Sequence, residues 1–354
     1  MTETPFSLGY KMPAEWEEHD ATWLSWPKDP ESFPEEILPR VEDSYIRMID
    51  ALHRNERVCL LVDDEKSERR VAQLLKSNGI DSTNIAMHRI PTSDVWFRDY
   101  GPIFVTKKGG VAFTRWRFNA WGGKYEELKR DAQIPDKIPL GGIRGFNVQM
   151  VLEGGSIDMN GLGTCLTTEQ CLLNSNRNPS MGKSQIEKNL ADYLGATNII
   201  WLKSGIEGDD TDGHVDDLAR FVNRDTVVCA VESNHRDDNY NALKDNYAIL
   251  EQAKDQDGKK LKVVQIPMPG KVLYNGQRLP ASYANFYIAN KTVLVPIFDD
   301  PNDQKALGIL GKLFPERKVV GINCRDLVYG FGSIHCVTQQ QPKTPRVDSD
   351  LGVG

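Results

Sequence analysis

Amphipathic helical patterns recur along the chain and alternate with short apolar runs. Apolar side chains three and four residues apart predict five helices, most of them about 60 residues from the next. These cover residues 35–53, 125–131, 183–194, 239–253 and 304–313. Between them, runs rich in β-branched residues predict strands over 58–62, 102–105, 148–152, 198–202, 226–231, 263–266, 292–297 and 318–322. The alternation indicates an α/β fold. Its recurrence favours a propeller or a solenoid, because repeated units bury their apolar faces against their neighbours.

The composition indicates a globular protein with a large core, since 40% of the residues are hydrophobic and 26% are charged. The formal net charge of -7 disfavours a nucleic-acid surface and favours a cationic small molecule as partner. No apolar run approaches a membrane span, and the first residues do not read as a secretion signal. Because no Pro/Gly/Ser linker divides the chain, we expect one catalytic domain over residues 1–345 and a tail over residues 346–354.

One of the six scattered cysteines, Cys336, has an unusual approach. The absence of a Cys-x-x-Cys pair argues against a zinc ribbon or a disulfide framework, so we expect reduced thiols and a cytoplasmic location. Residues 330–335, Gly-Phe-Gly-Ser-Ile-His, precede the sulfur, and glycines allow a substrate to come close to the backbone. Cys336 is therefore a candidate nucleophile. The alternative is a buried, small apolar side chain at the head of a strand over residues 335–338.

An acidic segment, residues 207–217, contains six acids and one histidine. If residues 213–216 are extended, His214 and Asp216 point to the same face and can supply a proton-transfer group and a carboxylate to one pocket. A calcium loop would need a glutamate where Ala219 stands. A metal site built on the His-x-Asp pair and a solvated acidic loop stay open as alternatives, although the other histidines form no supporting cluster of ligands.

A third candidate is the segment 96–102, which follows Asp94 and leads into a predicted strand. An aromatic ring beside a carboxylate suits a flat cation, because the ring stacks on its face while the acid accepts its hydrogen bonds. Trp96 and Asp99 could form such a receptor, whereas the alternative is a surface turn at Arg98 and Asp99. Three further polar segments, 118–123, 152–156 and 282–286, are equally well explained as turns or sheet rims.

Seven blocks in the same order resemble the agmatine deiminases, which belong to the wider peptidylarginine-deiminase-like superfamily. The resemblance extends from about Pro13 to Pro342. The blocks are 13–17 (PAEWE), 96–99 (WFRD), 118–123 (FNAWGG), 153–155 (EGG), 212–216 (DGHVD), 280–287 (PASYANFY) and 334–340 (IHCVTQQ).

The resemblance implies a five-bladed α/β propeller (pentein) of ββαβ units around one central active site. It also implies hydrolysis of a guanidino group without a metal or organic cofactor, with agmatine converted to N-carbamoylputrescine and ammonia as the leading reaction. Cys336 corresponds to the nucleophile, His214 to the proton-transfer group, and Asp99 and Asp216 to the acids that bind the guanidinium. Further substrate contacts are assigned to Trp96, Asp94, Asn285, Glu153, Trp121 and Gly332.

Several departures from the family pattern concern the substrate. Phe331, Ser333 and Tyr100 stand where many agmatine deiminases have Gly, Gly and Thr. Arg115 and Arg117 could meet a carboxylate, so free or peptidyl arginine stays an alternative substrate. A metal-dependent hydrolase and a non-catalytic binding propeller are alternatives of other classes. We expect a cationic guanidino molecule as partner, no nucleic acid and no membrane; a homo-oligomer stays open. Nearby acids should keep the resting sulfur a thiol.

Overall fold

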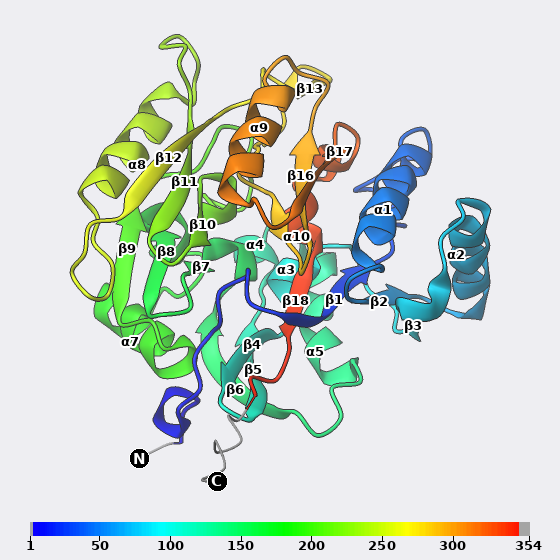
Figure 1. The fold of residues 1–354 in the computed structure, drawn as a ribbon, viewed down its shortest axis with the longest axis horizontal. Helices are drawn as coiled ribbons and strands as arrows, with labels where there is room; N and C mark the ends of the chain where they lie inside the picture. Colours follow the sequence, from blue (N-terminus) through cyan, green and yellow to red (C-terminus); the bar gives the residue numbers. More distant parts are fainter. Residues whose placement is uncertain (1–2, 347–354) are drawn as a thin grey trace, which may run out of the picture.

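Five sheets of three or four strands surround the centre of the molecule in the computed structural model, which describes residues 3–346 (Figure 1). Residues 347–354 of the predicted tail lie outside the described residues. A sixth, two-stranded sheet is the hairpin of β13 (Leu273–Tyr274) and β14 (Gln277–Arg278). The division into one catalytic domain and a tail stays a prediction.

Four of the sheets repeat one connection, in which an antiparallel hairpin is followed by a helical crossover and a parallel strand. Parallel neighbours require such a crossover, whereas antiparallel ones can be joined by a tight turn. The strands are β4 (Ile103–Lys107), β5 (Gly110–Arg117) and β6 (Arg144–Val151); β7 (Asp158–Met159), β8 (Thr164–Thr168) and β9 (Asn198–Leu202); β10 (Ala219–Asn223), β11 (Thr226–Val231) and β12 (Lys262–Pro267); β15 (Tyr287–Ile288), β16 (Thr292–Ile297) and β17 (Lys318–Asn323).

The crossover helices differ in length and regularity from one sheet to the next. They are η3 (Glu126–Gln133) with α5 (Ile134–Lys137) in the first of these sheets, then α6 (Glu169–Leu172) with α7 (Lys183–Leu194), then α8 (Tyr240–Gln252), and finally α9 (Asp303–Leu313). A short helical turn, α4 (Ala120–Gly123), follows β5. The repeated unit is therefore ββαβ.

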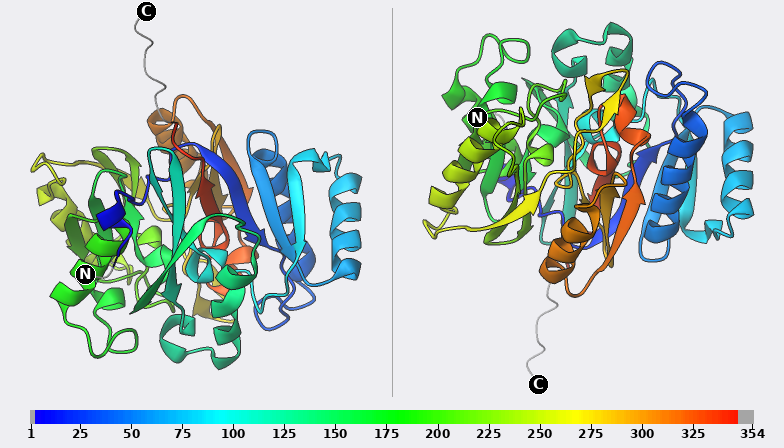
Figure 2. Two further views of the ribbon diagram at one scale, coloured as in Figure 1. Left: turned by 90° about the horizontal axis from the view of Figure 1, so that it is seen from below. Right: turned by 90° about the horizontal axis from the view of Figure 1, so that it is seen from above.

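The fifth sheet is completed by the two ends of the chain. β18 (Gln339–Pro342) pairs antiparallel with β1 (His19–Ser25), so that Gln339 lies opposite Trp23. β1 then pairs in parallel with β2 (Arg57–Val62), which pairs in parallel with β3 (Ile85–Arg89). α1 (Leu38–Leu52) and α2 (Glu65–Ser77) connect these strands. The first and last strands lie side by side in both views of Figure 2. The predicted five-bladed α/β propeller is confirmed.

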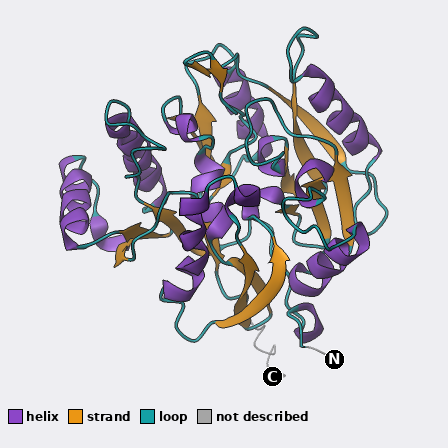
Figure 3. Ribbon diagram, turned by 180° about the vertical axis from the view of Figure 1, so that it is seen from behind, coloured by secondary structure: helices purple, strands orange, loops and turns teal. Residues whose placement is uncertain are grey.

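The long helices lie at the periphery, while short ones lie near the middle of the molecule (Figure 3). Four short central elements contact one another: α3 (Phe97–Tyr100), η4 (Gly154–Ser156), η5 (Val215–Asp217) and α10 (Ile334–Val337). Two clusters of buried apolar side chains support them. Within residues 3–346, no helix has both the length and the apolar character that a membrane crossing requires.

Most predicted elements agree with the structure, but two local interpretations are wrong. Helix 183–194 and strands 198–202, 226–231 and 292–297 have the predicted bounds. Residues 335–338 do not begin a strand, because Ile334–Val337 is a turn of helix and β18 starts at Gln339. Residues 213–216 are not extended either, since Val215–Asp217 forms a 3₁₀ turn. His214 and Asp216 still approach each other, but through this turn.

Candidate active site

A pocket of about 350 Å³ opens at the centre of the propeller, and Cys336 is part of its wall. Five of the ten residues assigned from the sequence line it: Asp94, Trp96, Asp99, Trp121 and Cys336. The other five are buried and are not among the lining residues: His214, Asp216, Glu153, Asn285 and Gly332. The structure thus brings together side chains that are up to 242 positions apart in the sequence (94 to 336).

Cys336 lies in α10, where its sulfur contacts two buried polar side chains. Its Sγ is 3.2 Å from Asn285 Nδ2 and 3.8 Å from Asp216 Oδ2. Burial raises the pKa of the Cys336 thiol well above its ordinary value, and the carboxyls of Asp216, Asp217 and Asp99 raise it further. The empty site therefore favours the thiol over the thiolate.

Gly332 gives the sulfur and the indole of Trp96 room to lie together. A Cβ at this position would collide with Trp96 Cζ3 and lie 3.1 Å from Cys336 Cβ. The two residues before Gly332, Gly330 and Phe331, both line the pocket. Phe331 has a left-handed backbone (φ 68°), which is unusual for a residue other than glycine. The glycine-containing approach to Cys336 is thus a loop at the pocket wall.

Asp99 is held rigidly in α3 by two donors. The backbone N–H of Gly155 donates to Oδ1 at 3.0 Å, and Trp121 Nε1 donates to Oδ2 at 2.9 Å. Burial raises the pKa of Asp99 to about 6, although the imidazole of His214 acts in the opposite direction.

Asp94 supports the indole of Trp96, because Asp94 Oδ2 accepts a hydrogen bond from Trp96 Nε1 at 2.7 Å. Burial also raises the pKa of Asp94 to about 6.

His214 is completely buried between carboxyl and thiol groups. Its Nδ1 lies 3.9 Å from Asp99 Oδ1. Burial alone would lower the pKa of this imidazole, but Asp99, Cys171 and Asp216 raise it well above its ordinary value. This raised pKa favours the protonated imidazole, which is the state that a proton donor needs.

Glu153 lies beside this histidine and is not among the residues that line the pocket, so its assignment as a substrate contact stays a prediction. It is fully buried, and potential ligand atoms of Glu153, Cys171 and His214 lie within 4.8 Å of one another. Such a triad could hold a metal ion. However, Arg177 Nε already donates to Glu153 Oε1 at 2.7 Å, so the cluster has its own counter-charge.

The two arginines that suggested a carboxylate-bearing substrate lie outside the pocket. Arg115, on β5, forms an ion pair with Asp136 at 2.6 Å. Arg117 donates to Gln149. That interpretation is wrong, because neither side chain lines the pocket. Tyr100 is also outside it: its hydroxyl donates to the Asp94 carbonyl at 2.9 Å.

Four functional neighbours were missed by sequence reasoning. His335 and Glu15 stand within the quoted blocks without an assigned role, and Asp217 follows the block that ends at Asp216. Burial raises the pKa of Asp217 well above its ordinary value, and Asp216 raises it further, while Asp217 Oδ1 accepts from Asn285 Nδ2 at 3.0 Å. Gly155 is the fourth. No local sequence pattern shows that these residues meet.

Replacing Gly155 by alanine should disrupt the site. A Cβ there would lie 2.6 Å from His214 Nδ1, 2.9 Å from Asp216 Oδ2 and 3.1 Å from Asp99 Oδ1. Displacing these groups by a fraction of an ångström should lower kcat/KM by about 100-fold. Steady-state turnover measures the loss. Gly182→Ala is the matched control, because a Cβ at Gly182 meets nothing within 4 Å. Equal turnover in both variants would contradict this packing.

Comparisons with known proteins agree with this geometry. The chain is 39% identical to an agmatine deiminase from Pseudomonas aeruginosa, over 96% of this chain and 98% of that protein. The structure of an agmatine deiminase from Enterococcus faecalis superposes with a TM-score of 0.90 at 33% identity, covering 97% and 98% of the two chains.

A cysteine-to-serine variant of agmatine deiminase from C. jejuni, solved with its substrate bound, has a TM-score of 0.85 and 32% identity over 95% of this chain and 97% of that one. The profile of the family described as "Porphyromonas-type peptidyl-arginine deiminase" matches residues 11–342. The chain therefore belongs to the Porphyromonas-type peptidyl-arginine deiminase family.

Proposed function

We propose that this protein hydrolyses agmatine to N-carbamoylputrescine and ammonia, with Cys336 as the nucleophile. The observation that carries the proposal is the charge of the pocket around the sulfur. No Lys or Arg is among the described residues that line it. Six carboxyl side chains do line it: Asp29, Glu31, Asp94, Asp99, Glu127 and Asp210. A molecule with a cationic group at each end fits this wall. Relatives of about the same length are agmatine deiminases.

The guanidinium would be held between Asp99 and Asp216 with its face on Trp96. Among the described residues no group donates a hydrogen bond to Asp216 Oδ1, although this atom is buried. An unpaired buried carboxylate oxygen is costly, so a substrate N–H is a natural donor to it. Asp99 is already oriented by Gly155 and Trp121. These contacts would fix the guanidino carbon close to the sulfur.

Substrate binding would itself activate the sulfur. A unit positive charge about 4 Å away, at an effective dielectric constant of about 20, favours the thiolate by roughly 4 kcal/mol, or about three pKa units. This offsets the burial and the three carboxyls that raise the pKa of Cys336 in the empty site. The thiol proton leaves to solvent as the cation enters. The Cys336 thiolate thus forms when the substrate guanidinium is bound beside it.

Two steps then complete the reaction. The thiolate forms a bond to the guanidino carbon, and His214 donates a proton to the departing nitrogen, so that the C–N bond breaks and ammonia leaves a thiouronium on Cys336. His214 next takes a proton from water, and the hydroxide adds to the same carbon. As the carbonyl forms, the C–S bond breaks, and the hydroxyl proton passes to the sulfur. The ureido product is released and the resting thiol is restored.

Agmatine should be preferred over arginine by at least about 100-fold in kcat/KM, because the arginine carboxylate would enter a pocket of like charge. An ammonia-release assay with agmatine, free arginine and a peptide ending in arginine tests the proposal. Equal turnover of arginine would contradict it, and no turnover of any of the three would overturn guanidino hydrolysis itself. A cytoplasmic location and a homo-oligomer stay predictions; the six buried, unpaired cysteines support the former.

A further inference from the structure

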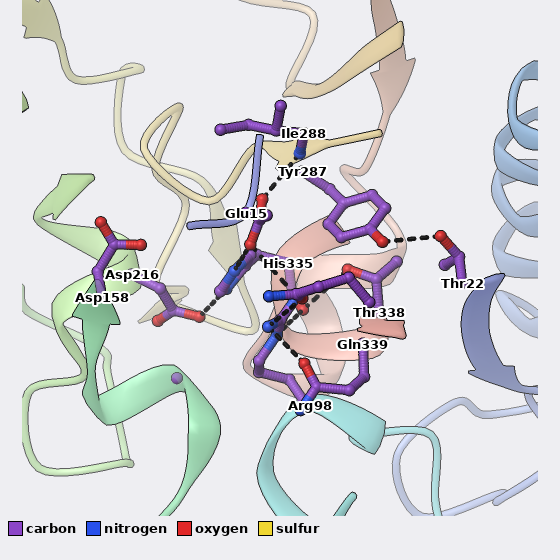
Figure 4. A network of polar contacts seen from close by, with 12 residues as sticks. Glu15, Thr22, Arg98, Asp158, Asp216, Tyr287, Ile288, His335, Thr338 and Gln339 are labelled. Atoms are coloured by element: carbon purple, nitrogen blue, oxygen red, sulfur yellow. Dashed lines mark hydrogen bonds and ion pairs between the residues drawn. The ribbon is translucent and has the colours of Figure 1, made fainter. Parts of the chain in front are cut away.

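His335, the residue before the proposed nucleophile, lies between two buried carboxylates (Figure 4). Its Nδ1 is 2.7 Å from Asp216 Oδ2, and its Nε2 is 2.8 Å from Glu15 Oε2. An ionised carboxylate can only accept hydrogen bonds, and a neutral imidazole has one N–H. Two short contacts to two carboxyl groups therefore need a proton in each contact. The arrangement suits a ring that donates from both nitrogens.

The far end of this bridge is anchored in a strongly charged part of the core. Glu15 Oε1 accepts from the backbone N–H of Ile288 at 2.8 Å and lies 2.9 Å from Arg220 Nη2. Arg98 Nη2 is 3.5 Å from Glu15 Oε2. Without His335, the Glu15 carboxylate would thus still have Arg220 and Arg98 beside it. Asp216 also lies within the field of Arg220 and His214, but its direct ion pair is with His335.

The near end of the bridge reaches both groups that contact the sulfur. Asp216 Oδ2, which accepts from His335, is also the atom 3.8 Å from Cys336 Sγ. The backbone N–H of His335 donates to Asn285 Oδ1 at 2.9 Å, while Asn285 Nδ2 lies 3.2 Å from the sulfur. One residue thereby fixes the rotamer of the acid and of the amide beside the nucleophile.

We propose that His335 is a positioning residue that acts through Asp216: held by Glu15 at one ring nitrogen, it contacts Asp216 Oδ2 with the other and keeps that carboxylate turned so that Oδ1 faces the substrate guanidinium. This inference rests on the proposed function. It assigns a role in the reaction to the N-terminal segment that carries Glu15. That segment lies 320 positions from His335 in the sequence.

Two substitutions separate the two ends of the bridge. The amide nitrogen of asparagine stands as many bonds from Cα as Nδ1 of histidine, and that of glutamine as many as Nε2. His335→Asn can still donate to Asp216, whereas His335→Gln can donate only toward Glu15. We expect kcat/KM for agmatine to fall within about 10-fold for His335→Asn and by about 100-fold for His335→Gln, with the loss in the glutamine variant visible in kcat as well as in KM. Equal losses in the two variants would overturn the proposal.

A measurement on the wild-type protein adds a test that does not depend on turnover. Nitrogen-15 NMR of the protein labelled at histidine should show a proton on both ring nitrogens of His335, with the signal assigned by its loss in either variant. A neutral ring would overturn the bridge whatever the kinetics. If the wild-type protein releases no ammonia from agmatine while the ring is an imidazolium, the proposed function fails and the charge state stands.

Discussion

Replacing Cys336 by alanine should reduce ammonia release from agmatine by about 10,000-fold or more while the protein stays folded. The substitution removes the atom that forms the covalent intermediate, and no other thiol among the described residues lines the pocket. The lost volume is small, so circular dichroism and the melting temperature should change little. Turnover and folding are therefore measured on the same preparation.

The matched control for this result is Cys229→Ala. Cys229 is a fully buried thiol in β11, and burial raises its pKa to about 12, so it has the environment of a structural cysteine. This variant should retain turnover within about threefold. Full activity of Cys336→Ala would contradict a cysteine mechanism. Loss of wild-type activity on exhaustive chelation would instead support the metal-dependent alternative at Glu153, Cys171 and His214.

Asp99→Asn should lower kcat/KM for agmatine by about 100- to 1,000-fold, because a buried cation loses its charged partner at a cost of about 3–4 kcal/mol. The amide would also place a donor against either the Trp121 indole or the Gly155 N–H, both of which now donate to Asp99. Steady-state kinetics and agmatine binding to the variant should show the loss in KM and in kcat together.

The pH dependence of Asp99 supplies a second readout. Because burial holds its pKa at about 6 in the empty site, the carboxylate is ionised above that value and neutral below it. Wild-type kcat/KM should therefore decline as the pH falls below about 6.

The Cys336 thiol of the asparagine variant should also react faster with iodoacetamide, because one of the carboxyls that raise the pKa of this thiol is gone. Asp136→Asn, which removes the exposed partner of Arg115, is the control and should change neither quantity. Unchanged kinetics of Asp99→Asn would contradict the clamp.

The repeating units could be predicted from the sequence because their buried strands are apolar and β-branched. Strands 198–202, 226–231 and 292–297 have this character, and the last two are buried along most of their length. α2 was missed, since Val71 and Leu75 are its two buried residues and most of its other side chains are polar. β18 reads Gln-Gln-Gln-Pro, which no strand pattern would select. Hydrophobic periodicity therefore could not predict the strand that completes the ring.

The site was predictable in its chemical groups but not in their arrangement. Trp96 beside Asp99, and His214 beside Asp216, are close in sequence, so local patterns could suggest them. The contacts of Glu15 with His335 and of Gly155 with three side chains are made by segments far apart in the chain. They exist because the short central elements converge when the ring closes. The interpretation of Arg115 failed for the same reason. Its closeness in sequence to the 118–123 block does not show which way its side chain points.

The pairing of β18 with β1 joins two strands that are synthesised far apart in time. Until β18 has been made, β1 has one edge unpaired, and exposed strand edges promote association with other chains. Cys336 and His335 lie just before β18, so a nascent chain that stops before residue 335 lacks both the sulfur and the partner of Glu15. Pairing over such a separation is slow to form. Activity should therefore arise in a late folding step and not increase gradually during translation.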